Sequence, residues 1–344
     1  MKTRFCPSGV RLFIVLIPIF GHFMSLGQSV LDSLRSEGIC DSTGYCIPSI
    51  DGLPKPKGFE LKYRRIRDYE IKTKIGENRY TGRVDRNRET TIKLILPVVR
   101  KDHFMMALGA KYEVEEFRFD NHTKNNNSFY KYLEDKPLRS VGLTAYMGKS
   151  LIGDKFIMGR VNTRLSGDID KSKLINYFRS TVSIIYGQKR SSTISWGVGL
   201  TYNNTFGRQL VLPVLSYNRR FTDKLSTRIL LPVDIQFNYL INEKNVLRWS
   251  NKLSGDNYYI NSEPIATQNF YLSKSDFFST LAYERELYDF IWVSTNVGYH
   301  INYKFDLSTT NKLLSTDASA ISNSVQNAFS FQISLFFVPP KKWK

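Results

Sequence analysis

The sequence contains few cysteine and histidine residues. Its 344 residues include three Cys and four His. Cys40 and Cys46 stand close together in the stretch CDSTGYC, while Cys6 lies near the start of the chain. Two Cys residues without a further Cys or a His beside them make only half of a zinc site, so we expect no metal here and no cofactor elsewhere. In an exported chain such a pair favours a local disulfide, and we predict that Cys40 and Cys46 pair with each other.

Long apolar runs are also scarce. The one that stands out covers residues 12–20, well short of the ~20 residues that a spanning helix needs. It follows a basic start and precedes Ser25 and Gly27, which occupy the positions that a signal peptidase reads before Gln28. We therefore predict a cleaved signal peptide over residues 1–27. If the rest of the chain enters a membrane, it has to cross it as strands.

Acidic residues are outnumbered, and the formal net charge is +18. The cations are scattered along the chain and no nucleic-acid-binding motif is present, so we expect no nucleic acid partner. An exported basic protein is expected instead to face lipopolysaccharide phosphates, anionic solutes or carboxylates inside its own fold.

Alternation with period two dominates the chain from about Phe59 onward. The clearest examples are TISWGVGLTYN (193–203), IWVSTNVGYHINYKF (291–305) and NAFSFQISLFF (327–337). A helix would distribute these apolar residues all round its axis, so the pattern indicates strands with one apolar and one polar face. In the first stretch the apolar face comprises Ile194, Trp196, Val198 and Leu200, and the polar face comprises Ser195, Gly197 and Gly199.

The predicted connections fall into two classes. Short turns are expected at 100–102, 152–155, 188–192, 222–224, 242–245 and 287–289. Longer polar links are expected between them, for example at 76–89, 120–137, 255–275 and 306–324. Short turns at one end and long loops at the other are typical of bacterial outer-membrane barrels.

Three Leu-Pro-Val triplets punctuate the strands, at Pro97, Pro213 and Pro232. Proline cannot donate a ladder hydrogen bond, so each is expected at a bulge or at a strand end. The third is predicted to form a tight turn on the loop side, splitting 224–241 into two strands.

These patterns together predict an all-β protein, a closed antiparallel transmembrane β-barrel of about 12–14 strands. The barrel is expected over residues 59–338, after an irregular periplasmic leader at 28–58 and before a periplasmic tail at 339–344. The location is then the bacterial outer membrane with both termini periplasmic, and an even strand count follows. In lipid every backbone group needs a partner, so the apolar face of 329–337 is predicted to face lipid, on a last strand that pairs with the first.

The chain also resembles a known family. A mature end that starts with Gln, the Leu-Pro strand motif, the stretch GDNYYI and the ending FFVPPKKW are similar to the uncharacterised outer-membrane β-barrel family of Bacteroidota. The resemblance covers roughly residues 59–344. Because this family is a domain of unknown function, it implies a fold and a location and assigns no chemistry to any residue.

The predicted lumenal faces carry many charges. A packed, salt-bridged interior and a selectivity lining for small anions or a hydrophobic solute both remain open for them. His300 lies within the predicted reach of Ser294 and Ser330, but no fixed spacing supports a nucleophile and base pair, so no catalytic residue is assigned. The residues predicted to line the lumen are Arg160, Arg164, Arg179, Asp234, Arg248, Lys252, Glu284, Glu286, His300 and Lys304.

The sequence thus predicts an outer-membrane barrel of unknown specific role, with a narrow channel or transporter for small solutes as the first hypothesis. The alternative is a structural or surface-interaction barrel whose loops bind lipopolysaccharide or a partner. A lipid-modifying barrel enzyme is the third. The expected partners are outer-membrane lipid, lipopolysaccharide and the barrel assembly machinery.

Overall fold

A computed structural model describes most of the chain from residue 57 to residue 338. The described residues are Ile50, Leu53, 57–101, 103–126, 128–169, 174–204, 209–261, 269–309 and 321–338. The predicted signal peptide, nearly all of the leader with its Cys pair, and the tail at 339–344 lie outside the described residues.

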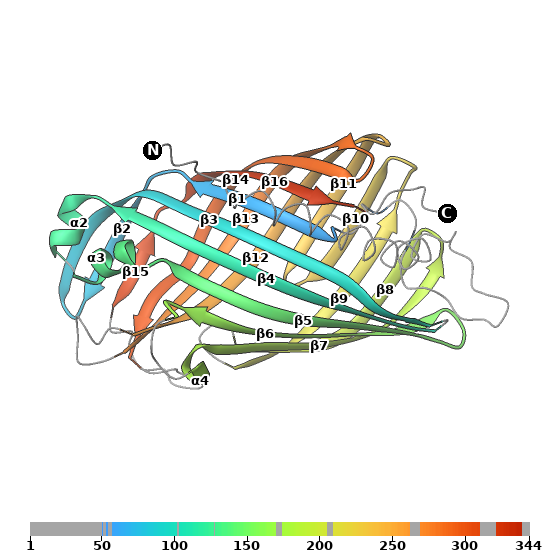
Figure 1. Cartoon of the computed structure of the whole chain (residues 1–344), viewed down its shortest axis with the longest axis horizontal. Helices are drawn as coiled ribbons and strands as arrows, with labels where there is room; N and C mark the ends of the chain where they lie inside the picture. The colour runs from blue at the N-terminus through green and yellow to red at the C-terminus, as the bar shows by residue number, and fades with distance from the viewer. Residues whose placement is uncertain are drawn as a thin grey trace, which may run out of the picture.

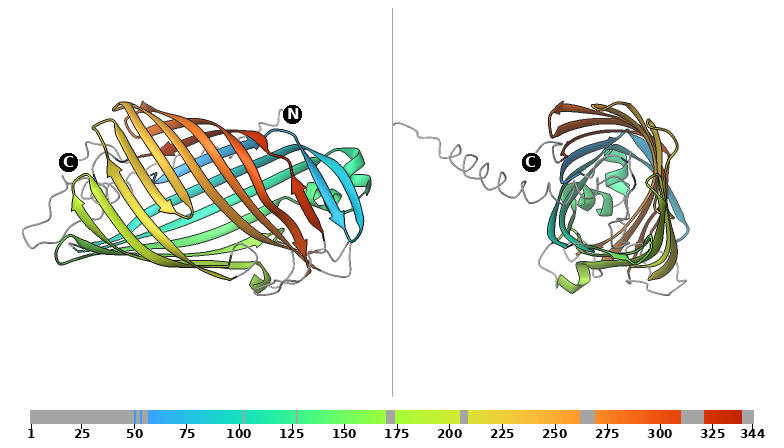
Figure 2. Two further views of the ribbon diagram at one scale, coloured as in Figure 1. Left: turned by 180° about the vertical axis from the view of Figure 1, so that it is seen from behind. Right: turned by 90° about the vertical axis from the view of Figure 1, so that its right-hand side faces the viewer.

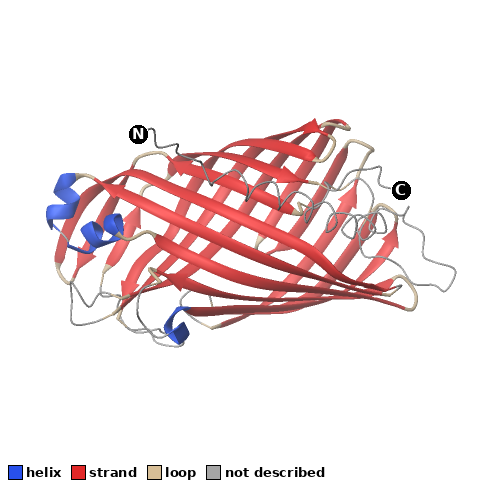
Figure 3. Ribbon diagram, in the orientation of Figure 1, coloured by secondary structure: helices blue, strands red, loops and turns tan. Residues whose placement is uncertain are grey.

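Strands dominate the described part of the chain, which contains sixteen strands and three short helices (Figure 3). The strands are β1 (Phe59–Ile66), β2 (Tyr69–Ile75), β3 (Asn78–Lys101), β4 (Phe104–Phe119), β5 (Leu138–Leu151), β6 (Lys155–Gly167), β7 (Phe178–Ser191), β8 (Ile194–Asn203), β9 (Leu210–Arg220), β10 (Leu225–Leu231), β11 (Asp234–Asn242), β12 (Asn245–Ile260), β13 (Phe270–Tyr288), β14 (Ile291–Ser308), β15 (Ser322–Val325) and β16 (Ala328–Phe337). The helices are α2 (Asn121–Asn126), α3 (Ser128–Asp135) and α4 (Leu174–Tyr177). None of the described helices is long and apolar enough to cross a membrane.

The strands form one closed sheet (Figure 1). β1 pairs antiparallel with both β16 and β3, which joins the last strand of the chain to the first. β2 continues the line of β1 along β3, and β15 continues the line of β16, so each of these pairs is one interrupted strand of the wall. The barrel therefore has fourteen strands, which confirms the predicted closed antiparallel barrel at the upper end of its expected size.

Apolar side chains point outward along the middle of the wall. On β8, Val198 and Leu200 are 50% and 55% exposed, while Ser195 is fully buried on the opposite face. On β16, Phe331 and Ile333 are exposed and Ser334 is buried. The predicted faces of both strands are confirmed, and an apolar outer band of this kind is what a membrane-embedded barrel presents to lipid.

The connections sort to two ends as predicted. All six expected short turns lie at one end, together with the start of β1 and the end of β16. We call this the turn end and the opposite one the loop end. The predicted loop at 76–89 is wrong, because only Gly76 and Glu77 turn and β3 begins at Asn78. β3 is 24 residues long, so its polar first part extends the wall into water, where an outward face needs no apolar residues.

The prolines of the three Leu-Pro-Val triplets occupy positions where no backbone N–H donor is needed for strand pairing. Pro232 forms the tight turn between β10 and β11, as predicted. Pro97 stands at a register shift between β3 and β4. Pro213 lies on β9 beyond Leu215, the last residue of β9 that pairs with β10.

The main apolar core fills the loop end of the barrel. It includes Phe129, Tyr130 and Leu133 of α3, which pack against inward residues such as Phe117 of β4 and Leu307 of β14. The end-on view in Figure 2 shows α2 and α3 within the outline of the barrel. We call α2 and α3 with this core the plug, because it occupies the lumen at this end.

One contact departs from the regular order of the wall. Gly167 at the end of β6 is paired in parallel with Tyr259 of β12, although five strands separate β6 from β12 in the sheet. Those five strands, β7 to β11, end before they reach the level of this contact. On the loop side of their ends, β6 and β12 therefore lie next to each other. A Cβ atom at Gly167 would overlap the carbonyl oxygen of Tyr259, so the close approach requires glycine.

Candidate functional site

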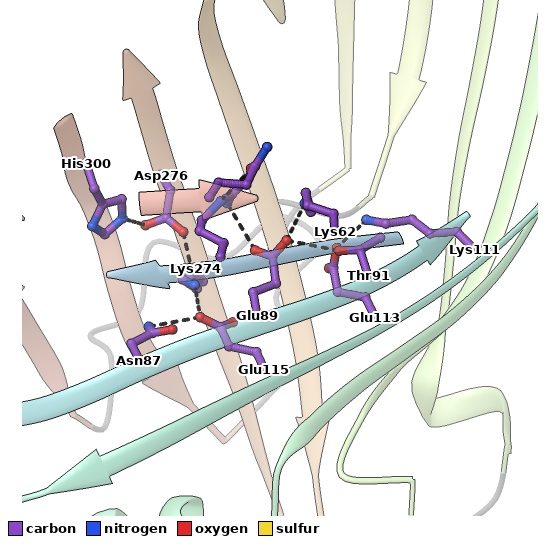
Figure 4. A network of polar contacts seen from close by, with 12 residues as sticks. Lys62, Asn87, Glu89, Thr91, Lys111, Glu113, Glu115, Lys274, Asp276 and His300 are labelled. Carbon is purple, nitrogen blue, oxygen red and sulfur yellow. Dashed lines mark hydrogen bonds and ion pairs between the residues drawn. The ribbon is translucent and has the colours of Figure 1, made fainter. Parts of the chain in front are cut away.

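A network of charged side chains occupies the lumen below the plug (Figure 4). Arg64 of β1 and Glu89 of β3 are directly opposite in the pairing of the two strands. Their Nη1 and Oε2 atoms are 3.0 Å apart, and Lys62 bonds the other oxygen of Glu89. Pairing register alone therefore brings these three charges together on the inward face.

The same row of charges continues onto β4. Thr91 of β3 donates to Glu89 at 3.1 Å and lies 3.2 Å from an oxygen of Glu113. Lys111 pairs with Glu113 at 2.5 Å. Three cations thus pair with two carboxylates along neighbouring strands, so each charge of this row has a partner of opposite sign.

A second group of charges reaches across the barrel. Lys274 of β13 pairs with Glu115 of β4, although β14, β16, β1 and β3 stand between these two strands in the sheet. Lys274 also lies 3.2 Å from Asp276, which accepts a 2.8 Å hydrogen bond from Nε2 of His300. All four side chains are buried, and the His300 ring stacks on Phe278, a residue of the plug core. This group therefore forms the polar floor beneath the apolar plug.

Two arginines hold β6 and β7 against the free edge of β12. β11 pairs with β12 only as far as Leu253. From there toward the loop end, the odd-numbered residues of β12 direct their backbone N–H and C=O groups to the side on which β11 has ended. Arg164 donates to the carbonyl of Gly255 at 3.1 Å, and Arg179 donates to the carbonyl of Asn257 at 2.9 Å. We call these contacts the arginine seam, because guanidinium groups take the place of strand donors there.

Asp168 completes the seam at its top. Its backbone N–H donates to the carbonyl of Tyr259, and its carboxylate accepts from Tyr132 of α3, Tyr177 of α4 and the N–H of Asn261. One carboxylate thus connects the end of β6, the edge of β12 and the plug. A seam that includes the plug couples any movement of α3 to the contact between β6 and β12.

Besides Arg179, whose guanidinium donates to carbonyl and amide oxygens of the seam, three lumenal cations have no carboxylate in salt-bridge contact among the described residues. They are Lys93 of β3, Arg160 of β6 and Lys252 of β12, and the last two are exposed. Lys93 is within electrostatic range of Arg160 and Lys111, and Lys252 is within range of Lys62 and Lys111. The carboxylates around them already have other cationic partners. Glu60 pairs with Lys57 and Glu89 with Lys62, and Asp234, which is directly opposite Lys252, pairs with Arg228. The middle of the lumen therefore carries uncompensated positive charge.

The structure places most of the predicted lining residues on the inward face. Arg248 and Glu284 pair at 2.9 Å, so these two form part of a compensated interior rather than a free lining. The residues that lie inward are Arg160, Arg164, Arg179, Asp234, Arg248, Lys252, Glu284, Glu286 and His300. Arg164 and Arg179, which were predicted to line the lumen, lie inward and belong to the seam.

Lys304 does not face the lumen, and its prediction is wrong. The register between β13 and β14 shifts at this point, with Asp276 opposite Asn302 and Ser275 opposite Lys304. The extra residue, Tyr303, reverses the alternation, so Lys304 shares the outward face of Ser275. A bulge has this effect because one inserted residue exchanges the two faces of a strand.

Several lumenal charges were missed from the sequence. Lys62 and Arg64 lie in FELKYRRI, whose strict alternation already indicates an inward polar face. Glu89 was assigned to a loop, and Lys274 was assigned to another. The alternation of β1 could have revealed the first two, whereas nothing local indicates that Lys274 reaches across the barrel to Glu115.

Catalytic chemistry finds little support in this arrangement. Ser294 donates to Asn296 at 2.6 Å rather than to His300, and the His300 ring donates from Nε2 to Asp276. Within the described residues no group of three or more His, Cys, Asp and Glu side chains could hold a metal ion.

Comparison with known proteins agrees with this architecture. A family model described as Domain of unknown function (DUF6268) matches residues 105–337. The chain belongs to this family. The match covers more than half of the chain and agrees with the resemblance predicted from its motifs. None of the curated proteins compared with the chain matches its sequence.

Solved structures of outer-membrane barrels are similar in fold. An outer membrane channel from Pseudomonas putida F1 has 7% identity and a TM-score of 0.41, with 84% of this chain and 98% of that chain covered. The P. putida toluene transporter TodX has 7% identity and a TM-score of 0.35, covering 82% and 90%. A Pseudomonas aeruginosa FadL homologue has 8% identity and a TM-score of 0.38, covering 92% and 98%. The first of these proteins is named a channel and the second a transporter, and at such identities and TM-scores the likeness assigns no role to this chain.

Proposed function

We propose that this outer-membrane barrel conducts small anionic solutes. The observation that supports the proposal is the uncompensated positive charge of Lys93, Arg160 and Lys252 on the inward face. A barrel that needed only rigidity would place each inward charge against one of opposite sign, as in the row from Lys62 to Glu113. Cations that face an interior without a carboxylate partner attract anions and repel cations, which is how charged linings set the selectivity of a pore.

The plug sets the resting state of the proposed channel. It occupies the lumen at the loop end, so conduction requires α3 to move away from the wall. We propose conduction rather than catalysis, because His300 is stacked and hydrogen-bonded without a nucleophile beside it in the described residues.

We also propose an orientation. The turn end, with the first and last strands, faces the periplasm, and the loop end faces outward, as the lengths of the connections favour. The alternating aromatic residues of β16 are then presented on the side from which the barrel assembly machinery inserts the protein.

Conductance of the purified full chain in planar bilayers tests the function. We expect discrete openings whose reversal potential in a salt gradient shows a preference for chloride over potassium. Lys252→Glu replaces an exposed lumenal cation by an anion and should shift the reversal potential toward cation preference. The matched control is Arg285→Glu on the outward face of β13, which should leave it unchanged.

Two results would contradict the proposal. A full chain that gives no openings, even at high voltage, would exclude conduction. Equal reversal potentials for the wild type and the Lys252 variant would remove the lumenal cations as the selectivity element.

A further inference from the structure

Four arginines lie together on the outward face of β1, β3 and β4. They are Arg65, Arg86, Arg88 and Arg118, and we call them the rim arginines. β1, β3 and β4 run side by side in the wall (Figure 1). Arg65 and Arg118 are exposed, and Arg86 and Arg88 are half-buried.

The rim arginines stand at the upper border of the apolar band. Arg65 is directly opposite Phe331 of β16, which is 45% exposed. Two rows further toward the turn end, Leu61, Ile92 and Tyr112 are opposite one another and all exposed. On β1, β3 and β4 the arginines therefore begin where the exposed apolar residues of the outward face end on the loop side. On the neighbouring β16, Phe329 is exposed one outward row further, opposite Tyr299 of β14, which is typical of the aromatic girdle at a membrane interface. We therefore expect the rim arginines at the depth of the lipid headgroups.

Their arrangement leaves positive charge uncompensated. Arg65 is directly opposite Arg88, and Arg86 is directly opposite Arg118. Like charges directly opposite on neighbouring strands destabilise a sheet. The carboxylate in the same rows is Glu116, opposite Arg88, and it forms no ion pair with any rim arginine. The Nε atom of Arg88 is buried and has no hydrogen-bond partner.

A neighbouring arginine on the same outward surface does have carboxylate partners. Arg83, further toward the loop end on β3, pairs with Asp68 and lies 3.6 Å from Asp85. None of the rim arginines has such a carboxylate among the described residues. On these strands the arginines without a carboxylate partner thus lie at the expected level of the headgroups.

We propose that the rim arginines bind the phosphate groups of a phosphorylated glycolipid of the outer leaflet, of the lipid A type. Guanidinium groups match phosphate oxygens in bidentate geometry, and four of them in two adjacent rows suit a headgroup with two phosphates. The acyl chains of the same lipid then cover Phe331 and the apolar rows below. This site rests on the orientation proposed above and is independent of conduction.

Retention of defined lipids by the purified full chain tests the site. Wild type, Arg65→Gln/Arg88→Gln and the control Arg219→Gln/Arg285→Gln are loaded with bisphosphorylated lipid A, and bound lipid is measured by native mass spectrometry. The control residues are exposed, outward-facing arginines nearer the turn end. We expect the rim variant to retain about tenfold less lipid A than wild type, and the control variant to match wild type.

Two further arms identify the lipid. Dephosphorylated lipid A should be retained no better by wild type than by the rim variant. Phosphatidylglycerol, the other source of phosphate, should not displace lipid A at equal concentration. Equal retention of lipid A by all three proteins would overturn the proposal, and so would displacement by phosphatidylglycerol. Heat-modifiable gel migration establishes that each variant is folded.

Discussion

At the scale of single residues, the two faces of β16 make a sharp test of the membrane assignment. Ile333→Arg places a charge in hydrocarbon, which costs about 2–4 kcal/mol near the bilayer middle. Gln332 faces the lumen and accepts a hydrogen bond from Arg64 at 3.3 Å, so Gln332→Glu gains an ion partner there. We expect the first variant to assemble poorly and the second to assemble normally, as measured by heat-modifiable migration of outer-membrane fractions. Equal folded fractions would contradict the outward assignment of Ile333.

Which face a residue occupies was largely predictable from the sequence. Alternation placed Val198, Phe331 and Arg248 correctly, because the period of a strand fixes the face once one member is known. Alternation failed at Lys304, because the bulge at Tyr303 exchanges the two faces of β14. Nothing in the local sequence pattern indicates this bulge. The role of Arg179 was also beyond reach, because its partner Asn257 lies on a strand that is distant in both sequence and sheet order.

At the scale of elements, two tyrosine hydroxyls attach α3 to the wall, beside Glu134, which accepts from the backbone N–H of Phe119 at 2.8 Å. Tyr130 donates to Asn323 at 2.7 Å, and Tyr132 donates to Asp168 at 2.7 Å. Tyr130→Phe/Tyr132→Phe removes these bonds and keeps the apolar rings, with a cost of roughly 1 kcal/mol for each bond. We expect more frequent openings in planar bilayers. The control is Lys131→Ala at an exposed position of the same helix, and an unchanged open probability in the tyrosine variant would argue against the plug as the gate.

The arginine seam permits a second test on elements. Arg179→Gln leaves the carbonyl of Asn257 without its donor, so the contact between β6 and β12 should weaken. The backbone N–H of Asp168, which donates to Tyr259, should then exchange faster with deuterium. Arg190→Gln, an exposed change on the same strand, serves as the control. Equal exchange in both variants would show that the seam does not depend on Arg179.

Strands and turns were predictable where the membrane requires an apolar outward face and a polar inward face. They were less predictable where the wall extends out of the membrane. The six short turns and the turn at Pro232 followed from the sequence. The first part of β3, at 78–89, did not, because a strand that extends into water carries charged residues outside and reads as a polar loop. The plug helices also read as a loop, since α3 is only eight residues long.

At the scale of the whole molecule, the contact between β6 and β12 divides the wall into two rings. The full barrel has fourteen strands. Of the described strands, β2 to β6 and β12 to β15 encircle the loop end, because β7 to β11 stop short of it. The barrel is therefore narrower at its loop end, which is why a plug of two short helices suffices to fill it.

The parallel sense of that contact has a topological origin. Strands of this barrel alternate in direction, and leaving out five of fourteen leaves nine. An odd number of alternating strands cannot close without one pair that runs the same way, so the parallel pairing of Gly167 with Tyr259 is imposed by counting alone. If this contact opens, the mouth is bordered by all fourteen strands instead of nine, and we expect the two arrangements to give two conductance levels. A current trace should switch between two levels rather than drift, and Arg179→Gln should lengthen the time spent at the higher one.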